Sequence, residues 1–243
     1  MTLLIGTGPQ IIAQKLHSES STALHDVGAI VHTNKGQILK YCKAGATALV
    51  MGSLYQASAE DTTNYQALTI TNAAAGDTSI TTTTTVTLAA NELAGGILTV
   101  ESATTGAGQM LGVKSHAAFT AAAATFQLED PVVVATTGTA LIDLIPNPFW
   151  KVVIQPTSRT SAPVGVAVYN VTAAYFGWLG VSGPFPVLAK GALTVGLHVT
   201  SSDATAGAVE VIADAANELL PPIGVALTGV ADTDFGMVNL NLL

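Results

Sequence analysis

The sequence predicts an all-β protein, with antiparallel β-barrel or sandwich domains behind an extended N-terminal arm. Three observations carry this prediction. The 243 residues include 32 Thr besides many Val and Ile, and β-branched side chains favour strands. The 23 Gly and 10 Pro residues recur between short apolar runs, as turn residues do between strands. Apolar residues nowhere follow a helical period over a sufficient length.

Residues 1–24 are predicted to form the N-terminal arm. This segment mixes apolar residues with Gly6, Gly8 and Pro9, which interrupt any long helix. It lacks the basic start and the long apolar stretch of a secretory signal. We therefore expect an extended segment or one short amphipathic turn.

Residues 25–155 are predicted to form a β-rich domain that opens with a hairpin. The stretch 29–32 leads into Asn34-Lys35-Gly36, a turn signal, and residues 37–43 then alternate polar with apolar. The run Ala48–Gly52 is expected to begin another strand.

A Thr-rich insertion follows in this domain and carries the run Thr81–Thr85. We read it as two or three strands joined at Gly76-Asp77 and Gly95-Gly96. Further along, Glu129-Asp130-Pro131 is predicted to turn the chain into an apolar strand, Val132–Val134. Two prolines near residue 147 then mark a break, so a boundary is placed between residues 150 and 160.

Residues 156–243 are predicted to form a barrel-like C-terminal domain with an internal repeat. Residues 163–179 align without a gap on residues 222–238, at an offset of 59 residues and with seven of seventeen positions identical. Each copy reads as a strand, a turn and a second strand, which makes two related hairpins. Phe176 and Phe235 are expected to fill equivalent core positions. A weaker similarity links Ala48–Gly52 with Ala192–Gly196.

Composition excludes several classes of function. Charged residues are 10% of the chain, against about 25% in typical domains, and the net charge is −8. With Arg159 as the only arginine, no basic stripe is available to neutralise phosphates, so we expect no nucleic-acid partner. Residues 160–189 are uncharged, but their Pro and Gly residues argue against a membrane span. So few charges suggest a surface that is hidden in an assembly.

No residue is predicted to be catalytic, to bind a cofactor or to bind a metal. The single cysteine, Cys42, excludes an intrachain disulfide and cysteine-rich zinc sites. Glu129 and Asp130 would point to opposite faces of a strand. Asp232-Thr233-Asp234 resembles part of a calcium loop, but it is more typical of a turn. No metal-binding motif joins the five histidines, which are His17, His25, His32, His116 and His198.

The aromatic residues near position 178 admit two interpretations. Tyr175, Phe176, Trp178 and Phe185 cluster within a dozen residues. They could stack against a carbohydrate, but aromatics are only 5% of the chain, so a core needs most of them. Packing is the favoured interpretation.

Several glycine-spaced strand patterns resemble those of capsid decoration, or cement, proteins of tailed bacteriophages. Gly28–Ala46 is similar to the opening hairpin of these head proteins, and the resemblance covers most of residues 25–243. Four further segments resemble their C-terminal barrel: Tyr175–Pro184, Gly191–Gly196, Ala206–Ala208 and Ile223–Ala226. The resemblance implies a virion protein on the capsid exterior, which binds the major capsid protein and itself, as a homotrimer, and it supplies no catalytic residues.

This resemblance gives the arm an expected role, since residues 1–24 would contact the capsid or a neighbouring subunit. The alternative is another virion component, such as a head fibre, a tail subunit or an adhesin that binds glycans through Trp178 or Tyr175. An enzyme, for example a polysaccharide depolymerase, would need a cleft with paired carboxylates, which the sequence does not reveal.

Overall fold

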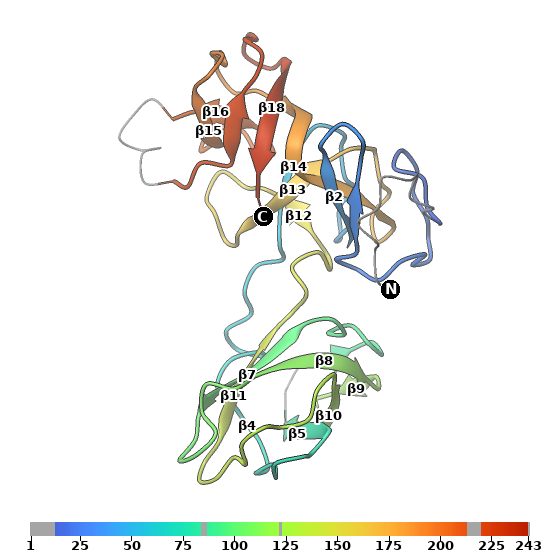
Figure 1. Ribbon diagram of the computed structural model, residues 1–243, viewed down its shortest axis with the longest axis vertical. Coiled ribbons are helices and arrows are strands. Elements are labelled where there is room, and N and C mark those ends of the chain that lie inside the picture. Colours follow the sequence, from blue (N-terminus) through green and yellow to red (C-terminus); the bar gives the residue numbers. More distant parts are fainter. Residues whose placement is uncertain (1–12, 84–86, 122, 213–219, 243) are drawn as a thin grey trace. The chain divides into compact units, whose positions relative to one another are not determined.

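The computed structural model describes residues 13–83, 87–121, 123–212 and 220–242 (Figure 1). In these residues every regular element is a β-strand, and the pairing of the eighteen strands into sheets is antiparallel throughout. The predicted all-β class is therefore confirmed. The described part of the chain holds no helix that is long and apolar enough to cross a membrane.

Contacts divide the chain into two compact units. The larger unit combines residues 1–59 with residues 148–243, and the smaller unit is Glu60–Asn147. This division differs from the predicted domains 25–155 and 156–243. The reason is that the early strands of the larger unit pair with strands that follow the smaller unit in the sequence. Periodicity along the chain carries no information about such distant pairing.

The larger unit is built on one ten-stranded sheet. Its strands follow the order β12-β3-β13-β14-β18-β17-β15-β16, and β2 pairs with both β1 and β14. The bounds are β1 Ile30–His32, β2 Ile38–Lys43, β3 Leu54–Gln56, β12 Val153–Ile154, β13 Pro163–Ala167, β14 Phe176–Leu188, β15 His198–Ser201, β16 Val209–Val211, β17 Gly224–Ala226 and β18 Phe235–Asn241.

The smaller unit has its own core and its own six-stranded sheet, in the order β4-β11-β7-β8-β10-β5. An isolated bridge between Ile70 and Thr82 brings the two ends of this order together, so the sheet forms a nearly closed barrel. Two short strands, β6 and β9, pair separately. The bounds are β4 Leu68–Thr69, β5 Ser79–Thr83, β6 Thr87–Leu88, β7 Ile97–Ser102, β8 Met110–His116, β9 Phe119–Thr120, β10 Ala123–Leu128 and β11 Leu141–Ile145.

The Thr-rich segment supplies strands of this barrel, as predicted. In β5 the side chains alternate between buried and more exposed positions, which is the period of a sheet with one face on a core. Thr82 is buried and donates its hydroxyl to the Thr69 carbonyl at 2.8 Å, so a polar side chain is satisfied inside the barrel. Residues 84–86, the end of the Thr run, lie outside the described residues.

Two local strand predictions are wrong and one is confirmed. The predicted hairpin exists, because β1 pairs with β2 in the register Ile30 to Lys40. The run 48–52 forms no strand but a turn with a single bridge between Leu49 and Val171. The run 132–134 forms no strand either, since the side chain of Gln109 accepts the N–H groups of Val133 and Val134 that a strand partner would take.

The sequence repeat is a structural duplication within the larger unit. In the first hairpin Ala167 lies opposite Leu179, and in the second Ala226 lies opposite Val238. These are the same two positions at the offset of 59 residues. The predicted pair of related hairpins is thereby confirmed, in one register.

The weaker similarity between residues 48–52 and 192–196 also belongs to the duplication. Leu49 bridges Val171 and, correspondingly, Leu193 bridges Val230. Gly52 donates to Ala167 at 2.8 Å, and its counterpart Gly196 donates to Ala226 at 2.8 Å. Both glycines have a positive φ, +80° and +84°, which a residue with a side chain adopts only with strain.

Apart from β1, the strands of the larger unit therefore form two copies of one arrangement. The first copy comprises β2, β3, β12, β13 and the first half of β14. The second copy comprises the second half of β14 followed by β15, β16, β17 and β18. The smaller unit is inserted between β3 and β12 of the first copy, where the second copy has only the turn of residues 202–208 between β15 and β16.

The copies differ at the paired phenylalanines. Phe176 is 6% exposed and belongs to the core, whereas Phe235 is 53% exposed. The prediction that both fill equivalent core positions is wrong for Phe235. Their backbone positions are equivalent, but the N-terminal segment covers only Phe176.

Candidate functional site

The N-terminal segment from residue 13 onward packs on the first copy. Ser20 and Phe176 exchange both backbone hydrogen bonds, at 3.1 and 2.8 Å. Gln14 is 2% exposed, and its side-chain Nε2 donates to the Phe176 carbonyl at 3.0 Å. The Tyr41 hydroxyl donates to Gln14 Oε1 at 2.6 Å, and Trp178 Nε1 donates to the Gln14 carbonyl at 3.3 Å. Residues 13–24 of the predicted arm are thus an integral part of the larger unit.

Further polar contacts extend this covering across the first copy. One nitrogen of the His17 ring lies 3.2 Å from the Val168 carbonyl. The Glu19 carboxylate accepts hydrogen bonds from both the backbone N–H and the hydroxyl of Thr172. Leu16 adds an apolar contact with the core. Residues 1–12, the other half of the predicted arm, lie outside the described residues.

The corresponding surface of the second copy is open and apolar. Phe235 corresponds to Phe176, and Leu227, which is 46% exposed, corresponds to the partly buried Val168. Leu197 is also exposed and accepts a hydrogen bond from Ala226, directly before Leu227. We call Phe235, Leu227 and Leu197 the second-copy surface. Exposed large apolar side chains on a sheet face that no other segment covers are candidate interaction sites.

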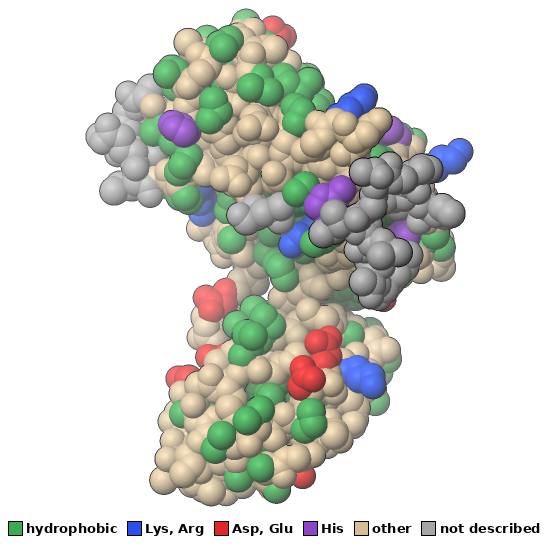
Figure 2. Space-filling view, viewed as in Figure 1, with side chains coloured by type: hydrophobic (Ala, Val, Ile, Leu, Met, Phe, Trp, Pro, Cys, Tyr) green, Lys and Arg blue, Asp and Glu red, His purple; other side chains and the backbone are tan. Residues whose placement is uncertain are grey.

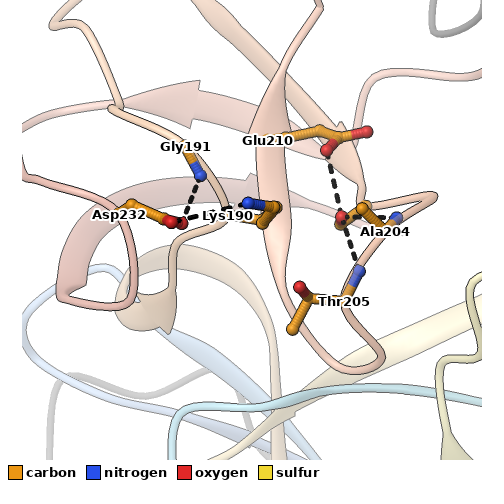
Figure 3. A network of polar contacts seen from close by, with 7 residues as sticks. Lys190, Gly191, Ala204, Thr205, Glu210 and Asp232 are labelled. Carbon is orange, nitrogen blue, oxygen red and sulfur yellow. Dashed lines mark hydrogen bonds and ion pairs between the residues drawn. The ribbon is translucent and has the colours of Figure 1, made fainter.

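A small polar network holds the loops of the second copy (Figure 3). Asp232 accepts the Gly191 N–H at 2.6 Å and the Lys190 ammonium at 3.4 Å. The Gly191 hydrogen bond, more than the charge of Lys190, lowers the pKa of the Asp232 carboxyl. The predicted turn role of Asp232 is confirmed, since its carboxylate ties two loops together.

A second part of this network closes the turn between β15 and β16. Ser202 donates its hydroxyl to Glu210 at 3.0 Å and accepts the N–H groups of Ala204 and Thr205, each at 3.1 Å. These side-chain hydrogen bonds hold the short turn in one conformation.

Charged groups are sparse on the visible face of the molecule, where hydrophobic side chains lie scattered among polar atoms (Figure 2). The ion pair of Lys190 and Asp232 is exposed and contributes little stability for that reason. The surface is thus suited to contacts made through shape and apolar area rather than through charge.

The histidines are not gathered into one site. His116 is buried in the smaller unit, where Nε2 accepts the Leu93 N–H and Nδ1 donates to the Ala117 carbonyl, each at 2.9 Å. Both ring nitrogens are satisfied, so this is a structural histidine. His25 packs against both Tyr41 and Trp178, which also contact each other. Among the described residues, no three His, Cys, Asp or Glu side chains are grouped so that they could hold a metal ion.

An open cavity of about 390 Å³ lies in the larger unit. Ser182, Asn239, Asn241 and His198 are the polar side chains in its described lining, which otherwise consists of Gly, Pro and apolar residues. The described lining includes no carboxylate, so it does not provide the paired acids that glycoside hydrolysis uses.

The aromatic cluster belongs to the core, as favoured from the sequence. Trp178 is 1% exposed and packs edge-on against Tyr41, while Tyr41 stacks on Phe176. Phe185 is buried in the same core. Of the two residues named for glycan stacking, only Tyr175 reaches the surface. The exposure of Phe235 is the feature that sequence reasoning missed, because the repeat identifies equivalent positions without showing what covers them.

Comparison of the chain with protein families, with curated proteins and with solved structures finds no match in any of the three.

Proposed function

We propose that this protein is a non-enzymatic virion component, a cement or decoration protein that binds the outside of an icosahedral phage head and stabilises it. In this proposal it acts as a homotrimer on the major capsid protein. The observation that carries the proposal is the second-copy surface, an apolar surface on a β scaffold in which charged residues are only 10% of the chain. Such a surface is suited to a permanent assembly.

A cement protein needs no reacting group, because it acts by mass action. Binding to the assembled lattice but not to the free capsid subunits shifts the assembly equilibrium towards the shell. A trimer multiplies the effect, since three linked contacts release together only rarely. A rigid scaffold supports this mechanism, and the two strand copies share one continuous strand, β14.

The test uses heads of the phage that encodes the chain, prepared without this protein. Purified protein is added, and bound protein is measured by co-sedimentation while the release of DNA on heating is followed by dye fluorescence. We expect saturable binding at a fixed ratio to the capsid protein and a higher release temperature. Absence of the protein from sedimented heads, at concentrations where it is fully trimeric, would overturn the proposal.

The alternative, a tail, fibre or adhesin component that binds glycans, predicts a different location and a different ligand. Of the two residues named for glycan stacking, Trp178 is buried, so Tyr175 is the one on which a sugar could stack. Fractionation of intact virions separates the two proposals, since the alternative places the protein with tails or fibres rather than with DNA-filled heads. Loss of glycan binding in Tyr175→Ala would support the alternative.

A further inference from the structure

The second copy leaves uncovered the surface that the N-terminal segment covers in the first copy. In the first copy, residues 14–20 cover Phe176 and contact Val168. The equivalent residues of the second copy, Phe235 and Leu227, are 53% and 46% exposed. The first copy therefore shows which kind of partner fits such a surface, namely a segment of chain that pairs with the backbone of the phenylalanine.

The backbone at Phe235 is oriented to receive such a segment. In the first copy Ala44 donates to the Tyr175 carbonyl at 2.8 Å, which makes the adjacent pair of Phe176 and Lys43 a non-hydrogen-bonded pair. The N–H and C=O of Phe176 therefore point away from β2, and Ser20 takes both.

The same geometry recurs in the second copy. Ala189 donates to the Asp234 carbonyl at 2.8 Å, and Phe235 lies opposite Leu188. The N–H and C=O of Phe235 thus point away from β14, in the direction from which Ser20 approaches Phe176. An edge position of this kind accepts a strand from another chain.

The N-terminal residues have the chemistry that this site requires. Residues 1–12 include no charged side chain and contain Leu3, Leu4, Ile5, Ile11 and Ile12. Residues 14–20, immediately downstream, already occupy the first copy of their own chain. An uncharged apolar segment adds no repulsion to a chain whose net charge is −8.

We propose that residues 1–12 of a second copy of this chain dock on the second-copy surface, with an extended segment that pairs with the backbone of Phe235 and covers Leu227. Each chain then gives one arm and receives another. Such head-to-tail contacts close into a ring when the rotation between subunits allows it. The inference rests on the self-association in the proposed function but not on binding to a capsid.

Disulfide trapping between two differently tagged chains tests the exchange. One chain carries Ile5→Cys and the other Phe235→Cys, and the native Cys42 does not interfere because it is fully buried. The matched control replaces Phe235→Cys by Val133→Cys, at a 76% exposed apolar position of the smaller unit. We expect a mixed dimer in the first combination at a yield at least about tenfold above the control.

Two results of the trapping experiment would overturn the inference. One is a mixed dimer no more abundant than the Val133→Cys control. The other is a double variant, Ile5→Cys with Phe235→Cys, that forms its disulfide only within single chains, because the arm would then dock on its own second copy.

Solution mass provides an independent readout. Leu227→Asp places a charge on the exposed surface, and we expect it to raise the dissociation constant of the oligomer at least about tenfold while circular dichroism remains unchanged. Val133→Asp is the matched control and should keep the wild-type mass. If wild type is an oligomer and Leu227→Asp associates equally well, the inference fails while the proposed function stands. If wild type is monomeric at every concentration, both the inference and the proposed homotrimer fail.

Discussion

The ring of Phe235 occupies the space in which a Cβ atom of Gly52 would stand. Gly52 lies in a turn of the first copy and Phe235 begins the last strand of the second, so this contact joins the two copies. The counterpart of Gly52 in the second copy, Gly196, has the same positive φ but nothing within 4 Å of its own Cβ position. Substitutions at the two glycines therefore distinguish the cost of a left-handed backbone, which both share, from the cost of packing against Phe235, which only Gly52 has.

Gly52→Ala is expected to destabilise the protein more than Gly196→Ala. Both variants place a side chain in a left-handed conformation, at about 1–2 kcal/mol each. Gly52→Ala adds overpacking against Phe235, which costs about a further 1–3 kcal/mol. Urea unfolding of the two variants measures the difference, and equal losses of stability would show that Phe235 moves away freely.

Gln14 is expected to stabilise the core through Tyr41. Gln14→Ala leaves the buried Tyr41 hydroxyl without its acceptor and should cost about 1–3 kcal/mol. Combined with Tyr41→Phe it should show a coupling of about 1 kcal/mol in the free energy of unfolding.

The matched control for this cycle is Tyr55→Phe, which removes another buried hydroxyl, the acceptor of the Val50 N–H. Tyr55 has no hydrogen bond with Gln14, so Gln14→Ala and Tyr55→Phe should be additive. Coupling of the same size in both cycles would contradict a specific contact between Gln14 and Tyr41.

Cys42 is expected to be unreactive in the native protein. Burial raises the pKa of its thiol to about 12, and the side chain is inaccessible. At pH 8 a thiol reagent should label native protein at least about a thousandfold more slowly than protein unfolded in guanidinium, because labelling waits for unfolding. Rapid labelling without denaturant would show that the region around Cys42 opens locally.

Tyr65 links the stability of the smaller unit to alkaline pH. Burial, with smaller contributions from Glu92 and Asp61, raises the pKa of its phenol to about 12 from an ordinary value of 10.0. Because the phenol loses its proton at lower pH in the unfolded state than in the folded state, the free energy of unfolding is unaffected below about pH 10 and falls as the pH rises towards 12. Burial also raises the pKa values of Tyr41 and Tyr55, so absorbance at 295 nm during alkaline titration should show several late ionisations, one of which is missing in Tyr65→Phe. An unchanged titration in that variant would contradict the assignment.

The inserted unit is expected to be separable from the rest. Residues 60–147 hold their own core, and the second copy joins its equivalent strands with a short turn. Residues 60–147 expressed alone should therefore unfold cooperatively with heat, and so should the chain in which a short Gly/Ser linker replaces them. A gradual, non-cooperative melt of either product would contradict this independence.

Local patterns in the sequence were sufficient to predict the hairpins. The alternation along residues 37–43 and the turn at Gly36 are set by neighbouring residues, and so is the matched spacing of glycine and phenylalanine in the repeat. The division into units was not predictable in this way. It depends on β3 pairing with β12 and β13, which lie beyond residue 147.

The difference in exposure between Phe176 and Phe235 could not be predicted from the sequence either. Phe176 and Phe235 are the same residue type in the same motif, yet only Phe176 has Ser20 beside it. At the site of the unformed strand, a single side chain, Gln109, takes the backbone groups of Val133 and Val134, and no alternation of residues signals that contact.

The shared strand β14 limits how this protein can change during evolution. Its first half pairs with β2 and its second half with β18, so one residue added or deleted between the halves would put the pairing of one copy out of phase with that of the other. Such a shift turns side chains from the core face to the solvent face. Changes in length are therefore confined to the loops, and the loop between β3 and β12 has accepted an entire folded unit.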